Sequence, residues 1–455
     1  MRILLVAYDF PPIPSPQSLR WSYLCRELAL AGHEVHVIAP DVAGYGAGGL
    51  PELPPGVAVH RVWPGPYAAY KTWRKRRASR RDMGKTADFA FVVDADSGAN
   101  KTARAPADAK LNWKGKLREK ALAMRAVAYA KLGLADRRLV QGLLSAVMFP
   151  DDRAEWVPWA KRALDGLLRD HPPDVVITSH EPANSIPVGL RASRKGFAWV
   201  ADLGDPVLAP YTPARWRKKA YRTEAAICQS ALLVTVTSEQ ARKTLLDRHP
   251  AAAGKVMVLT QGFDPRGEAD LPFPDSWLDE SKLEVLYTGS FYSFRSPGEL
   301  IEAVLTSDAV RLNVASIQVP QELAMAAAKR PDKFRLLGFV PHRMARLLQR
   351  RCDVLINISN DDPIQVPGKL YEYLGSGTPV LHIAKQDKDA ASELVERVSG
   401  GWVAADNHKE ITAFFQQALL LKRNGVLGQS RKIHPELNQF SWPELGRKLV
   451  NSIEK

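Results

Sequence analysis

A short stretch around residue 370 combines groups that could hold a phosphorylated sugar. Pro367 suits the first turn of a helix, and Gly368 leaves the first backbone amides of that helix open to an approaching anion. Lys369 adds a full positive charge at the same end, and Glu372 follows one turn later, near enough to hydrogen-bond sugar hydroxyls. This spacing suits a nucleotide diphosphate with its ribose, although an ordinary capped helix fits the composition about as well.

Strands and helices alternate along the chain, and this alternation must position those residues. Apolar runs at residues 2–8 and 34–39 predict buried strands on either side of a helix over residues 19–31. The pattern restarts after Gly262. The further predicted strands cover residues 175–178, 198–201, 232–236, 284–287, 311–314, 334–337, 354–358 and 380–383. We therefore expect an α/β protein with two doubly wound, Rossmann-like domains facing a cleft, with ligands beyond the carboxyl ends of the strands.

Length and composition agree with two globular domains. The chain has 455 residues, of which 45% are apolar and 25% charged, and this length exceeds what a single core usually supports. Its three cysteines, Cys25, Cys228 and Cys352, are far apart, which argues against both a disulfide scaffold and a structural zinc module. No apolar run approaches the roughly 18 residues of a transmembrane helix, and the apolar start is too short for a signal peptide. We expect a soluble, reduced, cytoplasmic protein.

The positive charge is concentrated in one segment. The formal net charge is +14, and residues 71–131 carry 17 Lys and Arg against 6 Asp and Glu. Trp73, Trp113 and Tyr129 are interleaved with these cations. A basic segment with aromatic residues indicates a binder of anionic surfaces, either lipid headgroups or nucleic acid. A solvated loop is the alternative interpretation.

Two motifs have the wrong context for the chemistry they suggest. Residues 44–49 satisfy G-x-G-x-x-G, but the proline-rich stretch that follows cannot open a helix, so a flexible loop is expected. Asp94 and Asp96 form a D-x-D pair inside the basic segment, with no strand to frame a metal site.

The stretch from Glu372 through Gly377 to Pro379 resembles the second half of the E-x7-E region of glycosyltransferase family 4, whose members are two-domain retaining enzymes that use nucleotide-sugar donors. Gly289 followed six residues later by Arg295 is similar to the family's glycine and lysine before the first helix of the second domain. Further similar segments are residues 8–12, 32–35, 149–151 with Trp156, 179–182, 202–206, 261–264 and 337–340. The resemblance covers nearly the whole chain except the basic segment. Residues 149–151 with Trp156 and residues 202–206 are similar to members that build bacterial surface polysaccharides.

The resemblance implies a GT-B fold with three parts. Residues 1–262 would form the acceptor-side domain, with a basic and membrane-facing insert at about residues 66–150. Residues 263–432 would form the nucleotide-sugar-binding domain. Residues 433–455 would supply a terminal helix that packs back on the first domain.

The resemblance also implies the site residues. The catalytic set is His180, Arg295, Lys369 and Glu372, with Arg295, Lys369 and the helix start at Gly368 compensating the departing diphosphate in place of a metal. The donor would be bound by Gly289, Ser290, Arg295, Gly338, Phe339, Val340, Pro367, Gly368, Lys369, Leu370 and Glu372. The acceptor side would be formed by Pro12, Ser15, His180, Glu181 and Asp205. No metal and no cofactor besides the nucleotide-sugar co-substrate are expected.

Two positions depart from the family pattern. Ile364 stands where the first glutamate of E-x7-E would lie, so either Asp361 or Asp362 replaces it or the donor lacks the hydroxyl usually held there. Ser290 stands where an arginine usually follows the glycine of the phosphate loop.

The expected function is a retaining, metal-independent transfer of a sugar to a lipid-linked or glycan acceptor, in lipopolysaccharide or other surface-polysaccharide biosynthesis. The enzyme would lie on the inner face of the plasma membrane, held there by the basic insert, with no nucleic acid partner. The alternatives are a non-catalytic protein that binds anionic membranes or polymers on a degenerate scaffold, and a sugar-nucleotide epimerase.

Overall fold

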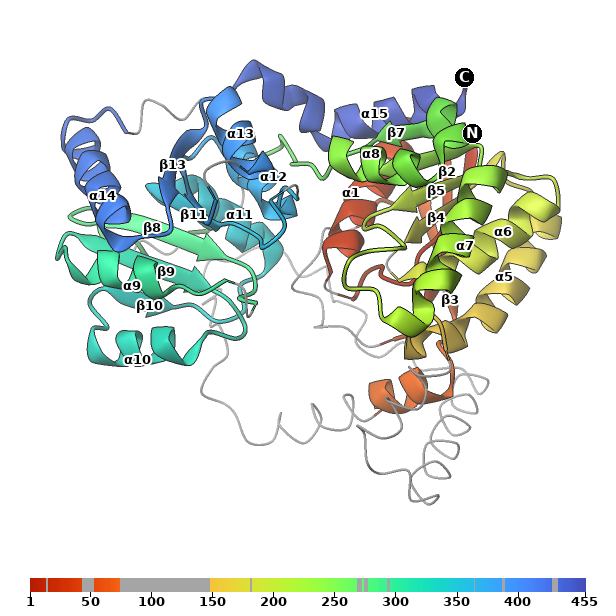
Figure 1. Cartoon of the computed structure of the whole chain (residues 1–455), viewed down its shortest axis with the longest axis horizontal. Helices are drawn as coiled ribbons and strands as arrows, with labels where there is room; N and C mark the ends of the chain where they lie inside the picture. The colour runs from red at the N-terminus through yellow and green to blue at the C-terminus, as the bar shows by residue number, and fades with distance from the viewer. Residues whose placement is uncertain are drawn as a thin grey trace, which may run out of the picture.

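The computed structural model describes residues 1–13, 15–42, 53–73, 148–180, 182–267, 272–273, 277–292, 295–363, 365–386, 389–427 and 433–455. They form two α/β units, each built around a parallel sheet (Figure 1). The glycine-rich loop at 44–49, the Asp94 and Asp96 pair, the insert from 74 to 147, Glu181 and Ile364 lie outside the described residues.

The described residues of the first unit form a seven-stranded sheet in the order β3-β2-β1-β4-β5-β6-β7. Its strands are β1 (Arg2–Val6), β2 (Glu34–Pro40), β3 (Val57–Val62), β4 (Val175–His180), β5 (Ala198–Leu203), β6 (Leu233–Val236) and β7 (Val256–Val258). The helices are α1 (Pro16–Leu30), α5 (Val157–Asp170), α6 (Ile186–Arg194), α7 (Ala214–Ser230) and α8 (Glu239–Arg248), with short 3-10 turns η1 (Asp152–Trp156), η2 (Ala183–Ser185) and η3 (Pro250–Lys255). Every pairing is parallel, so all carboxyl ends meet at one edge.

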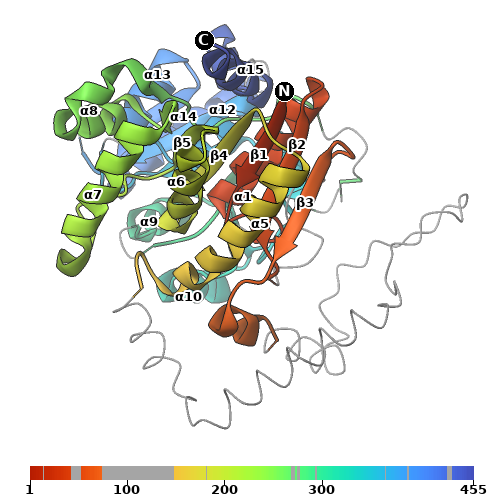
Figure 2. The same cartoon turned by 90° about the vertical axis from the view of Figure 1, so that its right-hand side faces the viewer.

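Alternation along β1 explains why helices cover both faces of this sheet. Ile3 and Leu5 point into a core shared with α1, while Leu4 and Val6 point into a core shared with α5 and α6. Successive strand residues face opposite sides of a sheet, and a strand that is apolar at both sets of positions must be covered on both. Figure 2 shows the strands between these two layers of helices.

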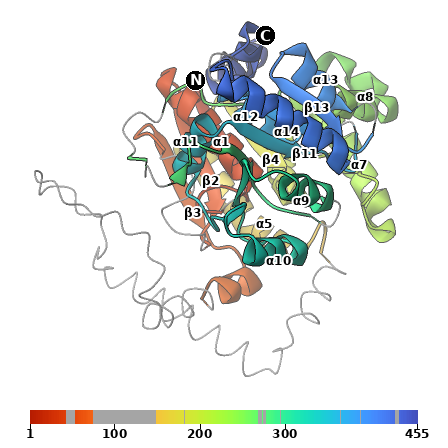
Figure 3. The same ribbon diagram turned by 90° about the vertical axis from the view of Figure 1, so that its left-hand side faces the viewer.

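The second unit repeats this plan with the strand order β10-β9-β8-β11-β12-β13. Its strands are β8 (Leu283–Thr288), β9 (Val310–Ala315), β10 (Phe334–Leu336), β11 (Val354–Ile358), β12 (Val380–Ala384) and β13 (Gly401–Ala405). Its helices are α9 (Gly298–Leu305), α10 (Gln321–Lys329), α11 (His342–Arg351), α12 (Gly368–Gly375), α13 (Ala390–Arg397) and α14 (His408–Arg423). One face packs on α9, α10 and α14 and the other on α12 and α13; Figure 3 views this unit.

The end of the chain returns to the first unit. After the turn η5 (Pro435–Phe440), helix α15 (Trp442–Ile453) places Trp442, Leu445 and Leu449 in the core beside α1 (Figure 1). Trp442 is almost fully buried and stacks on Tyr23 with ring centroids 5.4 Å apart. The expected boundary at residue 262 falls between the last strand of the first sheet and the first strand of the second.

Candidate functional site

Lys369 is the second residue of α12 and points back to the carboxyl end of β8. Its Nζ donates to the carbonyl oxygen of Thr288 at 3.2 Å and lies 3.7 Å from the centroid of the Tyr287 ring. Burial lowers the pKa of Lys369 well below its ordinary value, and the positive charge of Arg295 lowers it further. The structure therefore brings two of the predicted cations into one electrostatic neighbourhood, where each disfavours the charge of the other.

Arg295 is held at the same strand ends and is 7% exposed. One of its Nη atoms donates to the side-chain oxygen of Asn360, which follows β11, and the other approaches the Ser290 carbonyl oxygen at 3.5 Å. Gly289, which directly precedes Ser290, has φ +107, a conformation that favours glycine. A side chain at this position would approach Lys369. Asn360 was not anticipated, because nothing near it in the sequence marks its amide as an arginine partner.

The start of α12 offers backbone donors beside these cations. Pro367 occupies the cap position, and no side chain caps the helix. Gly368 lies against the linker between the two units, the segment that joins the end of β7 to the start of β8. An added Cβ at Gly368 would come within 3.2 Å of the side chain of Gln261 in this linker. Uncapped amides at a helix start bear partial positive charge. Two cations and these amides together suit a ligand with two or more negative charges.

Glu372 takes a different direction from Lys369. Its Oε1 lies 3.2 Å from Nε2 of His342, the first residue of α11, and that nitrogen lies 3.1 Å from the hydroxyl of Tyr23 on α1. The glutamate therefore faces the first unit. The predicted base-binding residues lie just before α11: Gly338 has φ +65, Phe339 is 45% exposed, and Val340 packs on the core.

On the first unit, His180 is the last residue of β4 and is 6% exposed. Burial lowers the pKa of its imidazole to about 4; Arg153 lowers it further, while Asp202 opposes the shift. The ring is therefore neutral near pH 7. Among the described residues, its Nδ1 is a buried atom without a hydrogen-bond partner.

The charge of Arg153 acts on His180, and two carboxylates lie beside Arg153; none of these three residues was predicted as a site residue. Arg153 pairs with Asp151 at 2.7 Å and lies 3.7 Å from Asp9, which follows β1. Burial raises the pKa of Asp9, opposed by Arg153 and by the hydroxyl of Ser15. Ser15 also caps α1 by accepting from the amide of Ser18 at 3.0 Å. The sequence signal for this cluster is that Asp9 and Asp151 lie in segments that resemble family 4, residues 8–12 and 149–151; Arg153 has no such signal.

Several buried polar atoms near these strand ends have no hydrogen-bond partner within the described part of the chain. They are Oε1 of Gln17, Oγ of Ser179, Nδ1 of His180 and Oδ1 of Asn184. Gln17 packs on Gly204, where any side chain would collide with its amide. Buried polar atoms are normally satisfied, so such a group can supply hydrogen bonds to a polar ligand.

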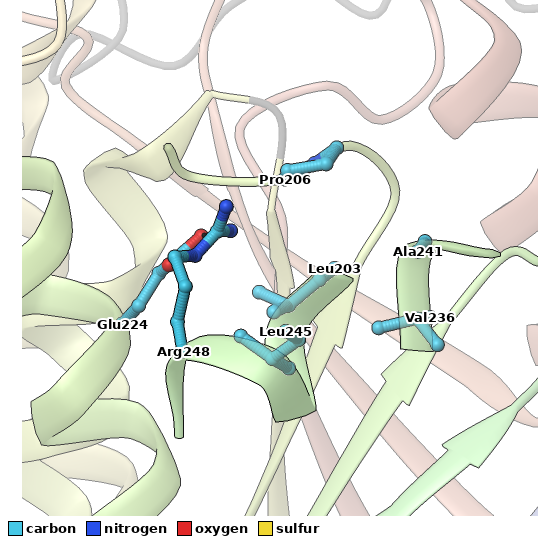
Figure 4. A pocket seen from close by; sticks show the side chains of 7 residues that line it. All are labelled: Leu203, Pro206, Glu224, Val236, Ala241, Leu245 and Arg248. Carbon is cyan, nitrogen blue, oxygen red and sulfur yellow. Dashed lines mark hydrogen bonds and ion pairs between the residues drawn. The ribbon is translucent and has the colours of Figure 1, made fainter. Parts of the chain in front are cut away.

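The loop after β5 carries Asp205 and is held from behind. The buried carboxylate of Glu224 accepts from the amide of Leu208 at 2.9 Å and from Arg248 at 2.8 Å. Figure 4 shows both side chains at one side of a small cavity, with Pro206 at its upper edge. The other residues that line it are Leu203, Val236, Ala241 and Leu245. Pro12 is half-buried in the loop before α1.

Asp202 is the first residue of the predicted Asp202–Pro206 segment. Its contacts stabilise the fold of the first unit. It is 1% exposed and accepts from Nη2 of Arg20 at 2.9 Å and from the indole of Trp21 at 3.0 Å. Arg20 also donates to the carbonyl oxygens of Leu259 and Thr260. This buried pair fixes α1 to the sheet and to the linker.

The arrangement of two parallel α/β units with a returning helix defines the class: it is the GT-B architecture found in glycosyltransferases. Residues 117–266 match the model of Glycosyltransferase Family 4, which confirms the resemblance over that part of the chain. No protein of curated function matches the sequence.

Solved structures share the fold over nearly the entire chain. A trehalose-6-phosphate synthase matches with a TM-score of 0.62 and 12% identity, covering 100% of this chain and 99% of its own. The catalytic domain of starch synthase IV from Arabidopsis thaliana, bound to ADP and acarbose, matches with 0.58 and 11%, covering 100% of both. A UDP-GlcNAc 2-epimerase from Methanocaldococcus jannaschii matches with 0.52 and 11%, covering 100% and 99%. The family match and the fold support the expected enzyme class, a nucleotide-sugar glycosyltransferase.

The described residues contain no group of three or more His, Cys, Asp or Glu side chains placed to hold a metal ion. None of their helices has the length and apolar character that a membrane span requires.

Proposed function

We propose that the protein is a retaining, metal-independent glycosyltransferase that moves a sugar from a nucleotide-sugar donor to a lipid-linked or glycan acceptor in surface-polysaccharide biosynthesis. The observation that carries this proposal is the pairing of Lys369 and Arg295 at the uncapped start of α12. Both cations lie in a buried setting, where a diphosphate would relieve their mutual repulsion. The resemblance to family 4 supports retention of configuration.

In the transfer, the bond from the anomeric carbon to the donor phosphate oxygen breaks while the acceptor hydroxyl oxygen bonds to that carbon. The hydroxyl proton passes to the leaving phosphate, so no protein nucleophile is needed. Lys369, Arg295 and the amides after Pro367 would stabilise the negative charge that develops on the diphosphate. In a buried site, fixed charges act more strongly than in water.

The first unit would hold the acceptor. His180 is neutral near pH 7, and Arg153 faces two carboxylates, those of Asp9 and Asp151. A site with more carboxylates than cations repels a phosphate, and its carboxylate oxygens can accept hydrogen bonds from the hydroxyls of a sugar. Asp205 on its supported loop is the further acceptor-side candidate.

The donor half of the proposal is tested by thermal unfolding with UDP-, GDP- and ADP-sugars. A ligand at 100 times its dissociation constant adds about 2.7 kcal/mol to the free energy of unfolding. One donor should raise the melting temperature of the wild type and of Lys329→Ala, a control at an exposed lysine of the same unit, and have little effect on Lys369→Ala. No shift with any donor would contradict the proposal.

The described residues also offer support for docking on the inner face of the plasma membrane. Residues 211–222, leading into and along α7, carry five Lys or Arg and no Asp or Glu. Tyr211 and Tyr221 are 69% and 46% exposed, and Lys219 lies over the ring of Phe149, near the end of the predicted insert. Near an anionic bilayer each engaged cation contributes on the order of 1 kcal/mol.

Flotation with vesicles tests this docking. The wild type should float with vesicles that contain phosphatidylglycerol, less so as salt rises, and not with pure phosphatidylcholine. Lys218→Glu with Arg222→Glu should weaken flotation, while Lys329→Glu should leave it unchanged. Binding that ignores salt and anionic lipid, or that prefers a nucleic acid competitor, would contradict membrane docking.

Two other functions agree with some of these observations. A non-catalytic membrane or polymer binder would explain the basic surface, and the epimerase neighbour shows that the fold alone does not separate epimerases from transferases. The match to family 4 favours transfer. Product analysis without acceptor separates an epimerase from a transferase, because an epimerase would convert the donor sugar on its own.

A further inference from the structure

One imidazole nitrogen connects the two units at the candidate donor site. Nε2 of His342 lies 3.2 Å from Oε1 of Glu372 and 3.1 Å from Oη of Tyr23. An ionised carboxylate only accepts hydrogen bonds, so the proton of this ring lies on Nε2 and is directed to the glutamate. The hydroxyl oxygen of Tyr23 contacts the same nitrogen and accepts from Nη1 of Arg346 at 3.3 Å.

Tyr23 is held firmly on the side of the first unit. Its ring is 1% exposed, stacks on Trp442, and carries the guanidinium of Arg26 4.7 Å above its centroid. Arg26 and Arg346 both donate to the carboxylate of Asp264 in the linker, at 2.8 Å and 3.3 Å. The hydroxyl of Tyr23 is therefore a fixed point, and His342 meets it only when the two units adopt this arrangement.

We propose that His342 is a positioning residue that holds the carboxylate of Glu372 ready for the donor and couples that readiness to the contact between the two units through Tyr23. This inference rests on the proposed function, because it takes Glu372 as the group that binds the sugar hydroxyls of the nucleotide. With Oε1 engaged by His342, Oε2 of Glu372 is left as the acceptor for two neighbouring ribose hydroxyls. Without His342, the glutamate regains rotamers that donor binding must again restrict.

The expected effect is a loss of donor affinity without a matching loss of stability. Freeing a glutamate side chain and removing one charge-assisted hydrogen bond should weaken donor binding about tenfold. Tyr23→Phe keeps the stacked ring and removes only the hydroxyl, so its effect should be smaller and should vanish when His342 is already absent. That non-additivity is the signature of a shared contact.

The test is calorimetric titration of the full-length protein with the nucleotide sugar that raises its melting temperature most. His342→Ala should bind about tenfold more weakly, His342→Gln should recover most of the loss because its amide can donate to Glu372, and Tyr23→Phe should add nothing to His342→Ala. Tyr221→Phe, an exposed tyrosine on α7, is the matched control. Equal donor affinity of His342→Ala and wild type, or full additivity with Tyr23→Phe, overturns this inference but leaves the proposed function standing. A wild type that binds no nucleotide sugar overturns the proposed function, and the inference with it.

Discussion

Replacing Lys369 by methionine should lower activity while raising the stability of the fold. The lysine amine is buried, and its contacts are a carbonyl oxygen, two aromatic rings and the repulsive charge of Arg295. Replacing buried charges by apolar side chains of similar volume is often neutral or stabilising, by about 1–4 kcal/mol for buried ion pairs, and the charge of Lys369 has no acidic partner among these contacts. We expect the lower end, because the rings of Tyr287 and Tyr373 partly favour the charge. The melting temperature of the unit should rise by roughly 2–4 °C.

The same change should weaken the enzyme. A charge-assisted hydrogen bond contributes about 1.5–3 kcal/mol, so kcat/KM should fall by roughly 10- to 150-fold, with calorimetry showing weaker donor binding. Because the folded state lowers the pKa of Lys369, the unfolded state binds more protons below the ordinary value near 10.5, and wild-type stability rises as pH approaches it. The stability advantage of Lys369→Met should therefore shrink from pH 7 to pH 10.

Denaturant unfolding across this pH range, with donor titration on the same samples, checks both halves. Lys329→Met, at an exposed position on α10, should change stability by no more than about 0.5 kcal/mol and leave turnover intact. If Lys369→Met lost stability together with activity, the lysine would be a structural group, and the argument for a diphosphate site would fail.

Two further predictions concern the first unit. Burial and two neighbouring histidines, one of them His36, lower the pKa of His60, so the unfolded state takes up more protons below about pH 6.5 and stability should fall between pH 7 and pH 5; His60→Gln should flatten that fall in denaturant titrations, and an unchanged profile would contradict it. Glu224→Gln removes the charge partner of Arg248 behind the Asp205 loop and should lower the free energy of unfolding by about 1–3 kcal/mol, measured by urea denaturation; a change within experimental error would show that the pair does not hold the loop.

Much of the fold could be predicted from local pattern. The strand at Val354–Ile358 agrees residue for residue, and the helix expected at 19–31 is found at Pro16–Leu30, begun by the Ser15 cap. Strands β3, β7 and β13 were not predicted. β3 is half-exposed along its length and β7 has three residues, so neither presents the buried apolar run on which the prediction depended.

For the candidate site, the sequence predicted several of the residues but not which residues they contact. The sequence pattern identified Lys369 and Arg295, but the partner of Arg295, Asn360, lies 65 positions away. The pair Tyr23 and His342 is separated by 319 positions. Such contacts depend on strand order and on how the two units meet, and neither is encoded in the spacing of a motif.

The two halves of the candidate site differ in charge in the way that sugar transfer requires. At the start of α12, two cations and uncapped amides lie at the ends of β8 and β11. At the end of β4, the imidazole of His180 is neutral, and nearby Arg153 faces two carboxylates, those of Asp9 and Asp151. A dianion is favoured at the first place and an uncharged polyol at the second, since an anion beside those carboxylates would be repelled. A protein that merely bound anionic polymers would have no reason to place two carboxylates around the guanidinium in one half.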